Sequence, residues 1–501
     1  MEAAAAAARR RMRGAWAQAV WPITVQVAAA AALVACLAAL PGTGALAVLA
    51  LSVASLGLRF VPSRTPTAAP AAPVQAATEP VFSVHVPIHA EPPGLVCATL
   101  AALAAQTRPA RQVVVVDNNT ADPALWQPVR DWCAGRAGFD FIHAMGVANA
   151  KAGALDIALA ATYPAATHVV LVDADYAADP DLLADAAARL RADPTLAALQ
   201  YPQAYAGESE VPGLAADYAR FFAVDAPRAD RAGAMLLTGT LSVIARDALD
   251  AGWGTRSITE DAEMGLRLLE RGGRVRFVPR ASGRGLMPMS LEGLVAQRRR
   301  WVVGNLQVAR MLARSPLDGA RKLAVLRQLL AWHGWLLLPV AGLAASALVG
   351  AGGTSGAAGL ARASAAALAV EVAVVALRAA RSPAPLAAAA AGWALAWTGS
   401  LAPLQALGRA PRFERTAKFA AAAVPAPFAP ATLHGVVVPV PLNAPLILGG
   451  ALFAAALLQR APALACGAAL VALVAPATRA LEREIARHAA ARREGPCTQP
   501  S

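Results

Sequence analysis

Charged residues are scarce in this sequence. Of its 501 residues, 15% are charged and 57% are hydrophobic, and a soluble globular protein carries more charge than this. The scarcity is uneven, because residues 81–315 hold most of the carboxylates whereas both flanks contain long apolar runs with few charges. This distribution excludes a wholly soluble protein. It predicts a soluble domain inserted between helices that span a lipid bilayer.

Cysteines are also few, and their spacing excludes two kinds of site. The five cysteines form no CxxC pair, so neither a zinc site nor a disulfide scaffold is predicted. The formal net charge of +13 would suit nucleic acid, but no nucleic-acid-binding module is visible and the excess lies beside the apolar runs. Basic residues at the cytoplasmic ends of spans explain that excess, so no nucleic-acid partner is expected.

Basic residues flank the apolar runs, and their positions predict the membrane topology. The candidate spans are 22–40, 44–59, 329–350, 356–377, 385–407, 433–457 and 461–478. Arginines at both outer ends of the first pair place those ends in the cytoplasm, although a cleaved signal peptide is an alternative for the first run. Arg381 and Arg412 both favour the cytoplasmic side. We therefore expect 385–407 to lie along the interface or to re-enter, which leaves six spans.

Strands and helices alternate within the soluble part. Strands are expected at 81–88, 111–119 and 167–175, and helices at 94–107, 121–135, 150–162 and 179–193. Strands separated by helices of this length predict an α/β domain whose mostly parallel sheet is covered on both faces. In such sheets ligands bind beyond the carboxyl ends of the strands.

Carboxylates follow two of these predicted strands. Asp117 ends "VVVVD", and Asp173 and Asp175 end "VVLVDAD". Each could cap the next helix or turn, and for Asp117 alone this reading is equally good. Capping needs only one carboxylate, however, whereas two acids one residue apart can both reach a hard cation. We predict that Asp173 and Asp175 hold Mg²⁺ or Mn²⁺, which in turn would hold a diphosphate.

Two further motifs lie closer to the second group of apolar runs. Thr259, Glu260 and Asp261 begin an amphipathic helix, where acids also suit the helix dipole, but a group-transfer enzyme needs a carboxylate as general base. Gln297 to Trp301, "QRRRW", lies in a basic amphipathic stretch at 289–316 that is typical of a helix resting on a membrane. Its arginines and tryptophan together offer phosphate donors and a stacking face.

Taken in order, these motifs resemble the membrane-embedded family-2 glycosyltransferases, the group that contains cellulose, hyaluronan, chitin and curdlan synthases. The resemblance is carried by a D, DxD, TED and QxxRW series and covers residues 81–315. A fifth motif, "FERTAKF", resembles the F-x-V-T-x-K gating loop of cellulose synthases. Phe413, Thr416 and Lys418 stand in that pattern, whereas Arg415 occupies the valine position.

The resemblance implies a GT-A fold and a UDP-sugar donor. Pro87 and Glu91 match the family's P-x-Y-N-E nucleotide-binding turn, from which His89 and Ala90 depart. Other residues are implied to contact the nucleotide sugar: Asp117 at the nucleoside, Lys151 of a K-A-G element, Asp173 beside the metal, and Arg300, Thr416 and Lys418 around the diphosphate.

The resemblance also assigns the chemistry. Asp261 would take the proton from the acceptor hydroxyl as general base, with Thr259 and Glu260 completing the catalytic motif. Trp301 would stack on the acceptor sugar, with Gln297 beside it. The metal on Asp173 and Asp175 would stabilise the leaving UDP, giving direct displacement and a β-linkage.

These assignments predict six segments along the chain. They are a transmembrane hairpin (1–64), a linker (65–80), a cytoplasmic GT-A domain (81–290), amphipathic interface helices with QxxRW (291–327), a transmembrane channel region with a gating loop at 408–420 (328–478), and a cytoplasmic tail (479–501). The implied location is the bacterial inner membrane, crossed several times. Any export or regulatory subunit would be a separate chain.

The leading hypothesis is a processive synthase that polymerises a β-glucan from UDP-glucose and threads it across the membrane. UDP-glucose is suggested by 117–129, which resembles the bacterial β-glucan branch. The alternatives within the class are another polymer made from UDP-N-acetylglucosamine and transfer of single sugars to a lipid. An alternative from another class is a membrane receptor or transporter with a nucleotide-sensing domain.

Overall fold

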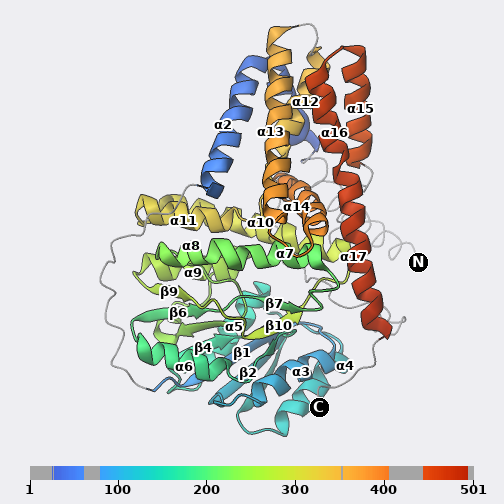
Figure 1. Cartoon of the computed structure of the whole chain (residues 1–501). Helices are drawn as coiled ribbons and strands as arrows, with labels where there is room; N and C mark the ends of the chain where they lie inside the picture. Colours follow the sequence, from blue (N-terminus) through green and yellow to red (C-terminus); the bar gives the residue numbers. More distant parts are fainter. Residues whose placement is uncertain (1–24, 26, 61–78, 351–353, 406–443, 495–501) are drawn as a thin grey trace, which may run out of the picture.

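The computed structural model describes residues 25, 27–60, 79–350, 354–405 and 444–494. An α/β domain lies beneath a bundle of apolar helices, and a layer of helices lies between them (Figure 1). Thr416 and Lys418, like the rest of the predicted gating loop, lie outside the described residues. So does most of the predicted linker at 65–80.

A seven-stranded sheet forms the centre of the α/β domain, in the order β3-β2-β1-β4-β8-β6-β9. Its strands are β1 (Phe82–Ile88), β2 (Gln112–Asn118), β3 (Phe139–Ala144), β4 (His168–Leu171), β6 (Leu196–Gln200), β8 (Ser242–Ala245) and β9 (Arg274–Phe277). Only β8 runs against its neighbours, β4 and β6. A small second sheet joins β5 (Ala177–Ala178), β10 (Gly283–Leu286) and β7 (Ala204–Ala206).

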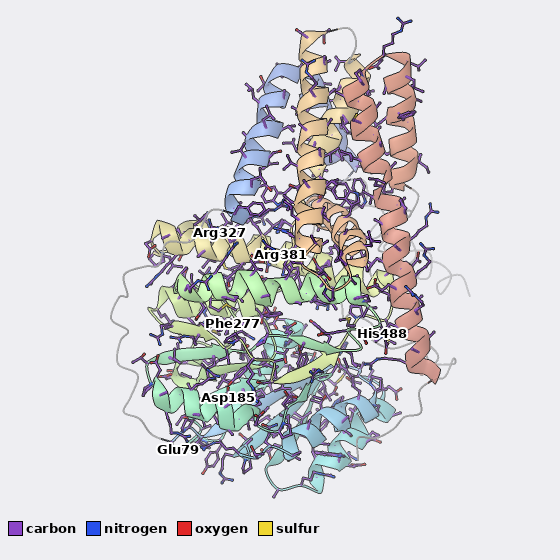
Figure 2. The ribbon with its side chains drawn as sticks, in the orientation of Figure 1. Glu79, Asp185, Phe277, Arg327, Arg381 and His488 are labelled. Carbon is purple, nitrogen blue, oxygen red and sulfur yellow. The ribbon has the colours of Figure 1, made fainter. Side chains whose placement is uncertain are left out.

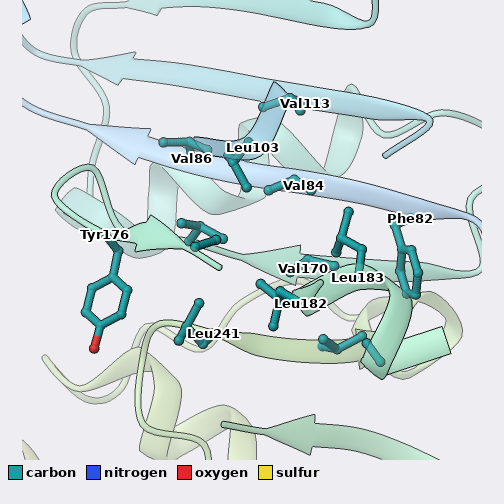
Figure 3. Packing of buried hydrophobic residues seen from close by; sticks show 14 of the residues in the cluster. Phe82, Val84, Val86, Leu103, Val113, Val170, Tyr176, Leu182, Leu183 and Leu241 are labelled. Carbon is teal, nitrogen blue, oxygen red and sulfur yellow. The ribbon is translucent and has the colours of Figure 1, made fainter. Parts of the chain in front are cut away.

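Helices cover both faces of the large sheet, and for that reason its strands are apolar without alternation. The helices of the domain are α3 (Pro93–Ala104), α4 (Pro123–Ala134), α5 (Ala150–Ala160), α6 (Leu182–Ala192), α7 (Pro212–Arg220), the π-helix η1 (Phe221–Asp225), α8 (Ala226–Arg231), the 3₁₀ helix η2 (Arg246–Leu249) and α9 (Glu260–Glu270). Successive valines of β2 face opposite sides: Val113 packs with α3 and α4, whereas Val114 packs with α5. Figure 3 shows Val113 beside Val84, Val86 and Leu103 in this core.

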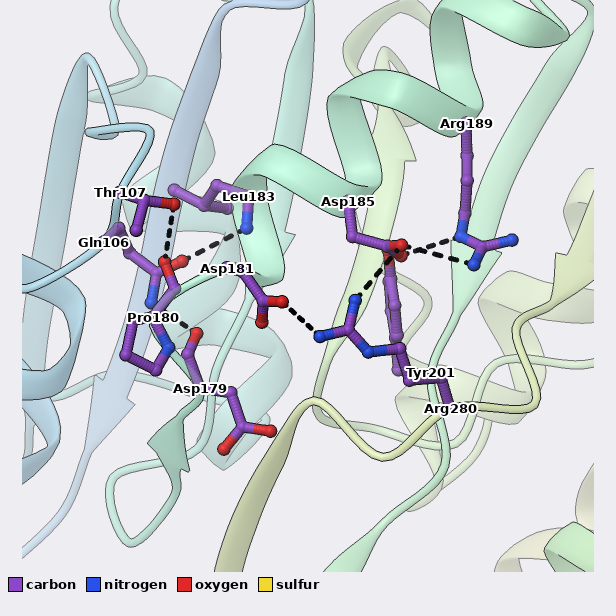
Figure 4. A network of polar contacts seen from close by, with 10 residues as sticks. All are labelled: Gln106, Thr107, Asp179, Pro180, Asp181, Leu183, Asp185, Arg189, Tyr201 and Arg280. Carbon is purple, nitrogen blue, oxygen red and sulfur yellow. Dashed lines mark hydrogen bonds and ion pairs between the residues drawn. The ribbon is translucent and has the colours of Figure 1, made fainter.

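Helix α6 is fixed to the domain by a polar network on the side away from the membrane bundle (Figure 4). Asp185 accepts hydrogen bonds from Arg189 at 2.7 Å and from the Tyr201 hydroxyl at 2.7 Å. Gln106 accepts one from the Leu183 N–H at 3.1 Å. These contacts hold in place the helix that follows the Asp173–Asp175 turn.

The layer above the domain consists of α10 (Leu291–Arg314) and α11 (Gly319–Leu329). Helix α10 contacts α9 of the domain on one side and the apolar α14 on the other. The amphipathic stretch expected at 289–316 is therefore a helix, and its buried residues include Gln297 and Arg298. It joins the domain to the bundle.

The bundle includes the apolar helix Val27–Ala39, α2 (Pro41–Phe60), α12 (Leu337–Val349), α13 (Ser355–Ala379), α15 (Ala444–Leu458), α16 (Pro462–Ala472) and the long α17 (Val474–Glu494). By length and apolar composition, Pro41–Phe60, Ser355–Ala379 and the stretch Pro462–Arg492 could each cross a membrane. Such helices indicate a membrane location. Which segments cross, and in which direction, stays a prediction.

The segment predicted to lie along the interface or re-enter is α14 (Pro385–Gln405). It packs against α7 and α10 as well as against α13 and α17, and it lies at the junction of the bundle with the domain (Figure 1). Arg381, just before it, lies at the same level (Figure 2). Its relation to the bilayer stays a prediction.

Candidate active site

A cavity of about 450 Å³ opens where β1, β2 and β4 end, beneath α10. The predicted site residues that line it are Pro87, Glu91, Lys151, Asp173, Asp175, Thr259, Glu260, Asp261, Gln297, Arg300 and Trp301. They come from segments more than 200 residues apart in the sequence. The structure therefore brings together every predicted site residue in the described ranges except Asp117.

Asp173 and Lys151 form the charged centre of the cavity. Strand β4 ends at Leu171, so Asp173 and Asp175 lie in the turn that follows rather than in the strand expected to reach 175. The Lys151 ammonium donates to Asp173 Oδ1 at 2.6 Å and lies 3.5 Å from Glu260 Oε1. Burial lowers the pKa of Lys151, but the charges of Asp173 and Glu260 outweigh burial and leave it raised. Lys151 is thus a permanent cation in the cavity.

The two carboxylates of the DxD turn provide a donor set that fits a divalent metal. Carboxylate oxygens suit Mg²⁺ and Mn²⁺. Among the residues that the structure describes, no cluster of three or more His, Cys, Asp or Glu side chains could hold a metal by itself. A cation on Asp173 and Asp175 would therefore need other oxygens, as Mg²⁺ does when it shares substrate phosphates.

Asp261 lies at the start of α9, where it is half-buried beside the same charges. Burial and the neighbouring Glu260 carboxylate raise the pKa of Asp261 to about 7, although Lys151 opposes the rise. A carboxylate that gains and loses a proton near neutral pH is suited to general base catalysis. The alternative that the TED motif only caps the helix is less apt, because the Thr259 side chain makes no hydrogen bond that caps α9.

Gly239 and Thr240 are site residues that the sequence reading missed. The Asp173 N–H donates to Thr240 Oγ1 at 3.0 Å, which fixes the DxD turn. Gly239 has φ +97°, and a Cβ there would lie 3.2 Å from Asp261 Oδ2. A side chain at 239 would be both strained and crowded against the candidate base. A glycine between two threonines is not a catalytic motif, so these roles needed the tertiary structure.

The TED segment is fastened to α10, the helix that carries QRRRW. Ser257 Oγ donates to the Gly304 carbonyl at 3.0 Å and lies 2.9 Å from Thr259 Oγ1. The Ile258 N–H donates to Gln307 Oε1 at 3.0 Å. A Cβ at Gly304 would lie 2.6 Å from the Thr259 side chain, so this glycine allows the two motifs to touch.

Aromatic side chains form the upper end of the cavity. Trp301 has its ring centroid 5.2 Å from Trp332 and 5.9 Å from Tyr218, and all three line the cavity. The Tyr218 hydroxyl donates to Gln297 Oε1 at 2.5 Å. Tyr218 and Trp332 were not among the predicted residues, because each is a single aromatic in an ordinary helical or connecting stretch. Aromatic rings have flat apolar faces, which suit the faces of sugar rings.

Arg298 lies behind these aromatics rather than in the cavity. Its side chain is 3% exposed, and it donates to Asp217 Oδ2 at 2.6 Å. Its guanidinium carbon lies 4.2 Å from the Trp332 ring centroid, 4.6 Å from that of Tyr218 and 5.1 Å from that of Trp301. Of the three arginines in QRRRW, Arg298 thus packs against the aromatic rings from behind, whereas Arg300 lines the cavity.

Asp117 is buried near the other end of the cavity and does not line it. It is 1% exposed, and it accepts hydrogen bonds from Thr120 at 2.5 Å and from His143 Nδ1 at 2.6 Å. The turn of Pro87 and Glu91 is closed by the His89 N–H, which donates to Glu91. The roles of Asp117, Pro87 and Glu91 toward a nucleoside stay predictions.

Comparison with known proteins identifies the domain. Residues 168–401 match the family described as Glycosyl transferase family group 2. A UDP-forming cellulose synthase catalytic subunit of Xanthomonas axonopodis pv. citri is 28% identical over 244 residues, which are 46% of this chain and 32% of that protein. The corresponding subunit of Komagataeibacter sucrofermentans is 26% identical over 245 residues, 46% of this chain and 31% of that protein.

A solved structure that resembles the chain is a mannosyltransferase, PcManGT, from Pyrobaculum calidifontis in complex with GDP-Man and Mn²⁺. It is 24% identical, with a TM-score of 0.48, over 73% of this chain and 98% of that chain.

The matches show what kind of domain this stretch of the chain contains. The chain carries a family-2 glycosyltransferase domain, homologous to cellulose synthase catalytic subunits. Its mostly parallel sheet with helices on both faces is the GT-A-like α/β fold, as predicted. The matched stretch covers about a third of the length of the curated relatives.

Proposed function

We propose that this protein is an inverting, processive glycosyltransferase that polymerises a β-linked polysaccharide from a UDP-sugar and moves the product across the membrane. The observation that carries the proposal is the single cavity lined by the DxD, TED and QxxRW residues. It combines a charged end, the half-buried carboxylate of Asp261 and an aromatic end in one space. The homology to UDP-forming cellulose synthase subunits supports the donor and the polymer.

The charged end would bind the donor. Lys151 and Arg300 line the cavity as cations, and both would neutralise the diphosphate as it leaves. Asp173 and Asp175 would hold a divalent cation, and that ion would supply Lewis-acid stabilisation of the leaving UDP. From outside the described residues, Thr416 and Lys418 are proposed to close over the nucleotide.

Asp261 would act as the base. Its carboxylate lies at the start of α9, lines the cavity and is within electrostatic range of the cation Lys151. It would accept the proton of the acceptor hydroxyl while that oxygen forms a bond to the anomeric carbon and the bond to UDP breaks. Attack opposite the leaving group inverts an α-linked donor into a β-linkage. Thr259 and Glu260 would position the base within the TED turn.

The aromatic end would bind the acceptor. Trp301 and Trp332 present ring faces on which a terminal sugar can stack, and Gln297 supplies an amide beside them. The acceptor end lies directly under the helices of the bundle, because α10 contacts α14. A growing chain would leave the site toward these helices. UDP-glucose is the donor we propose, and a β-glucan is the product.

The test is UDP release by the purified full chain in detergent with Mg²⁺ or Mn²⁺, measured over a panel of UDP-sugars. The product would then be sized and digested with linkage-specific glycosidases. Release with UDP-glucose and a digestible, high-mass product is expected. Release with one sugar but only a lipid-linked product would overturn processive synthesis. UDP binding without release from any donor would favour a sensing role instead.

A further inference from the structure

Helix α17 leaves the bundle and runs down beside the α/β domain (Figure 1). It contacts α7, α10 and α14. Its buried residues include Leu481, Glu484, Ile485 and His488, and a spacing of three and four residues places them on one face of the helix. The segment predicted as a charged tail, 479–501, thus begins with a helical part that packs against the domain.

The apolar residues of this face belong to the core of the proposed acceptor end. Leu481 and Ile485 pack in one buried cluster with Tyr205 and Tyr218. Trp301, which is partly buried, packs against the same cluster. These three aromatic residues line the cavity, whereas Leu481 and Ile485 do not. Helix α17 therefore supports the rings from the side away from the cavity.

Glu484 caps the start of α7, a helix that has no side-chain cap of its own. The residue before α7 is Val211, whose side chain makes no capping hydrogen bond. The Gly213 and Leu214 N–H groups in the first turn instead donate to Glu484 Oε1, at 2.8 Å and 3.2 Å. A carboxylate at this position satisfies donors that the helix itself leaves free, and it suits the positive end of the helix dipole.

The start of α7 fits closely between α17 and α14 because residue 213 is glycine. A Cβ at Gly213 would lie 2.5 Å from the Ala387 carbonyl oxygen on α14 and 3.1 Å from Glu484 Oε2. A larger residue would push α7 away from both helices. The two hydrogen bonds to Glu484 depend on this close approach.

His488, one turn further along α17, holds the loop between β7 and α7. Its side chain is buried, and its Nδ1 is paired with Glu210 Oε2. Gly207 in the same loop has φ +78°, and a Cβ there would lie 2.5 Å from His488 Cε1. Figure 2 labels His488 where α17 meets the domain. The loop thus closes around the imidazole ring.

The segments that Glu484 and His488 hold carry rings of the cavity. Tyr205 of β7 stacks on Tyr218 of α7, with ring centroids 4.7 Å apart and an interplanar angle of 30°. The Tyr218 hydroxyl donates to Gln297 Oε1 at 2.5 Å. A shift of the start of α7 would therefore move both rings relative to α10.

We propose that Glu484 and His488 are positioning residues for glycosyl transfer, which hold α7 and the loop before it so that Tyr205 and Tyr218 meet the acceptor glycan in one fixed arrangement. The inference rests on the proposed function, because that function assigns the acceptor to this end of the cavity. Neither Glu484 nor His488 lines the cavity, so both act through α7. Loss of the cap should weaken retention of the growing chain and leave donor binding unchanged.

The test separates retention of the growing glycan from binding of the donor, with the full chain in detergent. Glu484→Ala removes the acceptor of both hydrogen bonds. We expect the mean length of the product to fall about fivefold, the factor that loss of a helix cap typically brings. UDP affinity, measured by calorimetric titration, and the initial rate of UDP release should not change. Glu484→Gln keeps a side-chain oxygen and should restore most of the length.

A second variant leaves the buried face of α17 intact. The Glu210 side chain is 43% exposed, so Glu210→Ala removes the partner of His488 at little risk to folding, and shorter products are again expected. The matched control is Glu482→Ala. Glu482 lies on α17 two residues before Glu484, on the other side of the helix, and its replacement should change neither product length nor UDP affinity.

Hydrogen exchange supplies a readout that needs no activity. The amides of 204–220 should exchange faster in Glu484→Ala than in the unchanged chain or in Glu482→Ala, because the capped N–H groups are released. Faster exchange with products of unchanged length would overturn the positioning role, as would unchanged exchange. If the unchanged chain released no UDP from any donor, the proposed function would fall and the positioning role with it, whereas exchange would still show whether α17 caps α7.

Discussion

The two ends of the proposed catalytic cavity differ in how they are built. The end proposed to bind the donor is made of charged side chains: Asp173 and Asp175 lie in the turn after β4, and Lys151 lies in the first turn of α5. The acceptor end is made of aromatic rings from helices, with Trp301 on α10 and Tyr218 on α7. A nucleotide diphosphate needs charge and metal ligands, whereas a glycan needs flat apolar faces. The division matches the two substrates of one transfer reaction.

The two ends of the cavity also differ in the interactions that hold their side chains in place. The donor end is held by individual hydrogen bonds, such as that from the Asp173 N–H to Thr240. The acceptor end is held by a buried cation among rings, with Arg298 in contact with three aromatics and paired with Asp217. The comparison implies that substitutions at the two ends should separate chemistry from acceptor binding.

The largest effect is expected at the base between the two ends. Asp261→Asn should lower the rate of UDP release by about 10³-fold or more, since general base catalysis contributes factors of this order. UDP affinity should be unchanged, because asparagine keeps the size of the side chain. Calorimetric titration with UDP and a coupled assay of UDP release measure the two quantities. Retained turnover would remove Asp261 from the role of base.

The second-largest loss of turnover is expected from a substitution that crowds Asp261. Gly239→Ala introduces a methyl group 3.2 Å from Asp261 Oδ2 at a backbone φ of +97°. Strain of this kind costs about 1–3 kcal/mol, so we expect turnover to fall about tenfold or more. The matched control is Gly94→Ala on α3, where a Cβ meets nothing within 4 Å. Equal activity of the two variants would contradict a close approach at 239.

Replacing Arg298 should have a smaller effect on the rate of transfer but a clear effect on the binding of the acceptor chain. Arg298→Met leaves Asp217 without its partner, which should cost about 3 kcal/mol of stability. Product chains should shorten because Trp301 and Trp332 lose the packing that holds them. UDP binding should stay the same. Thermal unfolding, product sizing and UDP titration measure these three outcomes.

The pairing of Arg298 with Asp217 can be tested by a second substitution. Asp217→Asn added to Arg298→Met should restore part of the lost stability, because the unpaired carboxylate is removed. Arg310→Met, an exposed position on the same helix, serves as control and should change neither stability nor chain length. A double variant no more stable than Arg298→Met would argue against the ion pair.

The smallest expected effect is the change in the rate of UDP release with pH. The pKa of Asp261 is raised to about 7, and a base must be deprotonated to act. The rate of UDP release should therefore rise with pH through about 7, and at pH 6 about one tenth of the base would be active. A rate profile from pH 5 to 9 at saturating donor and metal checks this. A flat profile between pH 6 and 8 would mean that the bound substrates shift Asp261 or that another step limits the rate.

The alternation of strands and helices was predictable because continuous apolar runs ended in polar residues. The predicted strand at 111–119 corresponds to β2 and the predicted helix at 150–162 to α5. Several strands were missed. The strand β3 (Phe139–Ala144) is only half-buried at the sheet edge, and β8 (Ser242–Ala245) is four residues long. Short segments of this kind depend on pairing with neighbours and leave a weak pattern in the sequence.

The site was predictable where chemistry demands particular side chains in a short motif. Asp173, Asp175 and Asp261 could be read in this way, and all three line the cavity. Tyr218, Trp332 and Gly239 could not be, because an isolated aromatic or glycine has many ordinary reasons to be present. Their roles arise from contacts between distant segments.

By itself, the sequence determined which residues could bear charge, accept a proton or stack on a sugar, and where the chain is apolar enough for a bilayer. These are properties of single residues and of local runs. Only the tertiary structure decided that Arg298 packs against the rings while Arg300 faces the cavity, and that the TED segment is fastened to α10 through Ser257 and Gly304. The physical reason is that electrostatic and packing energies depend on distance in space, and neighbours in space are set by the fold.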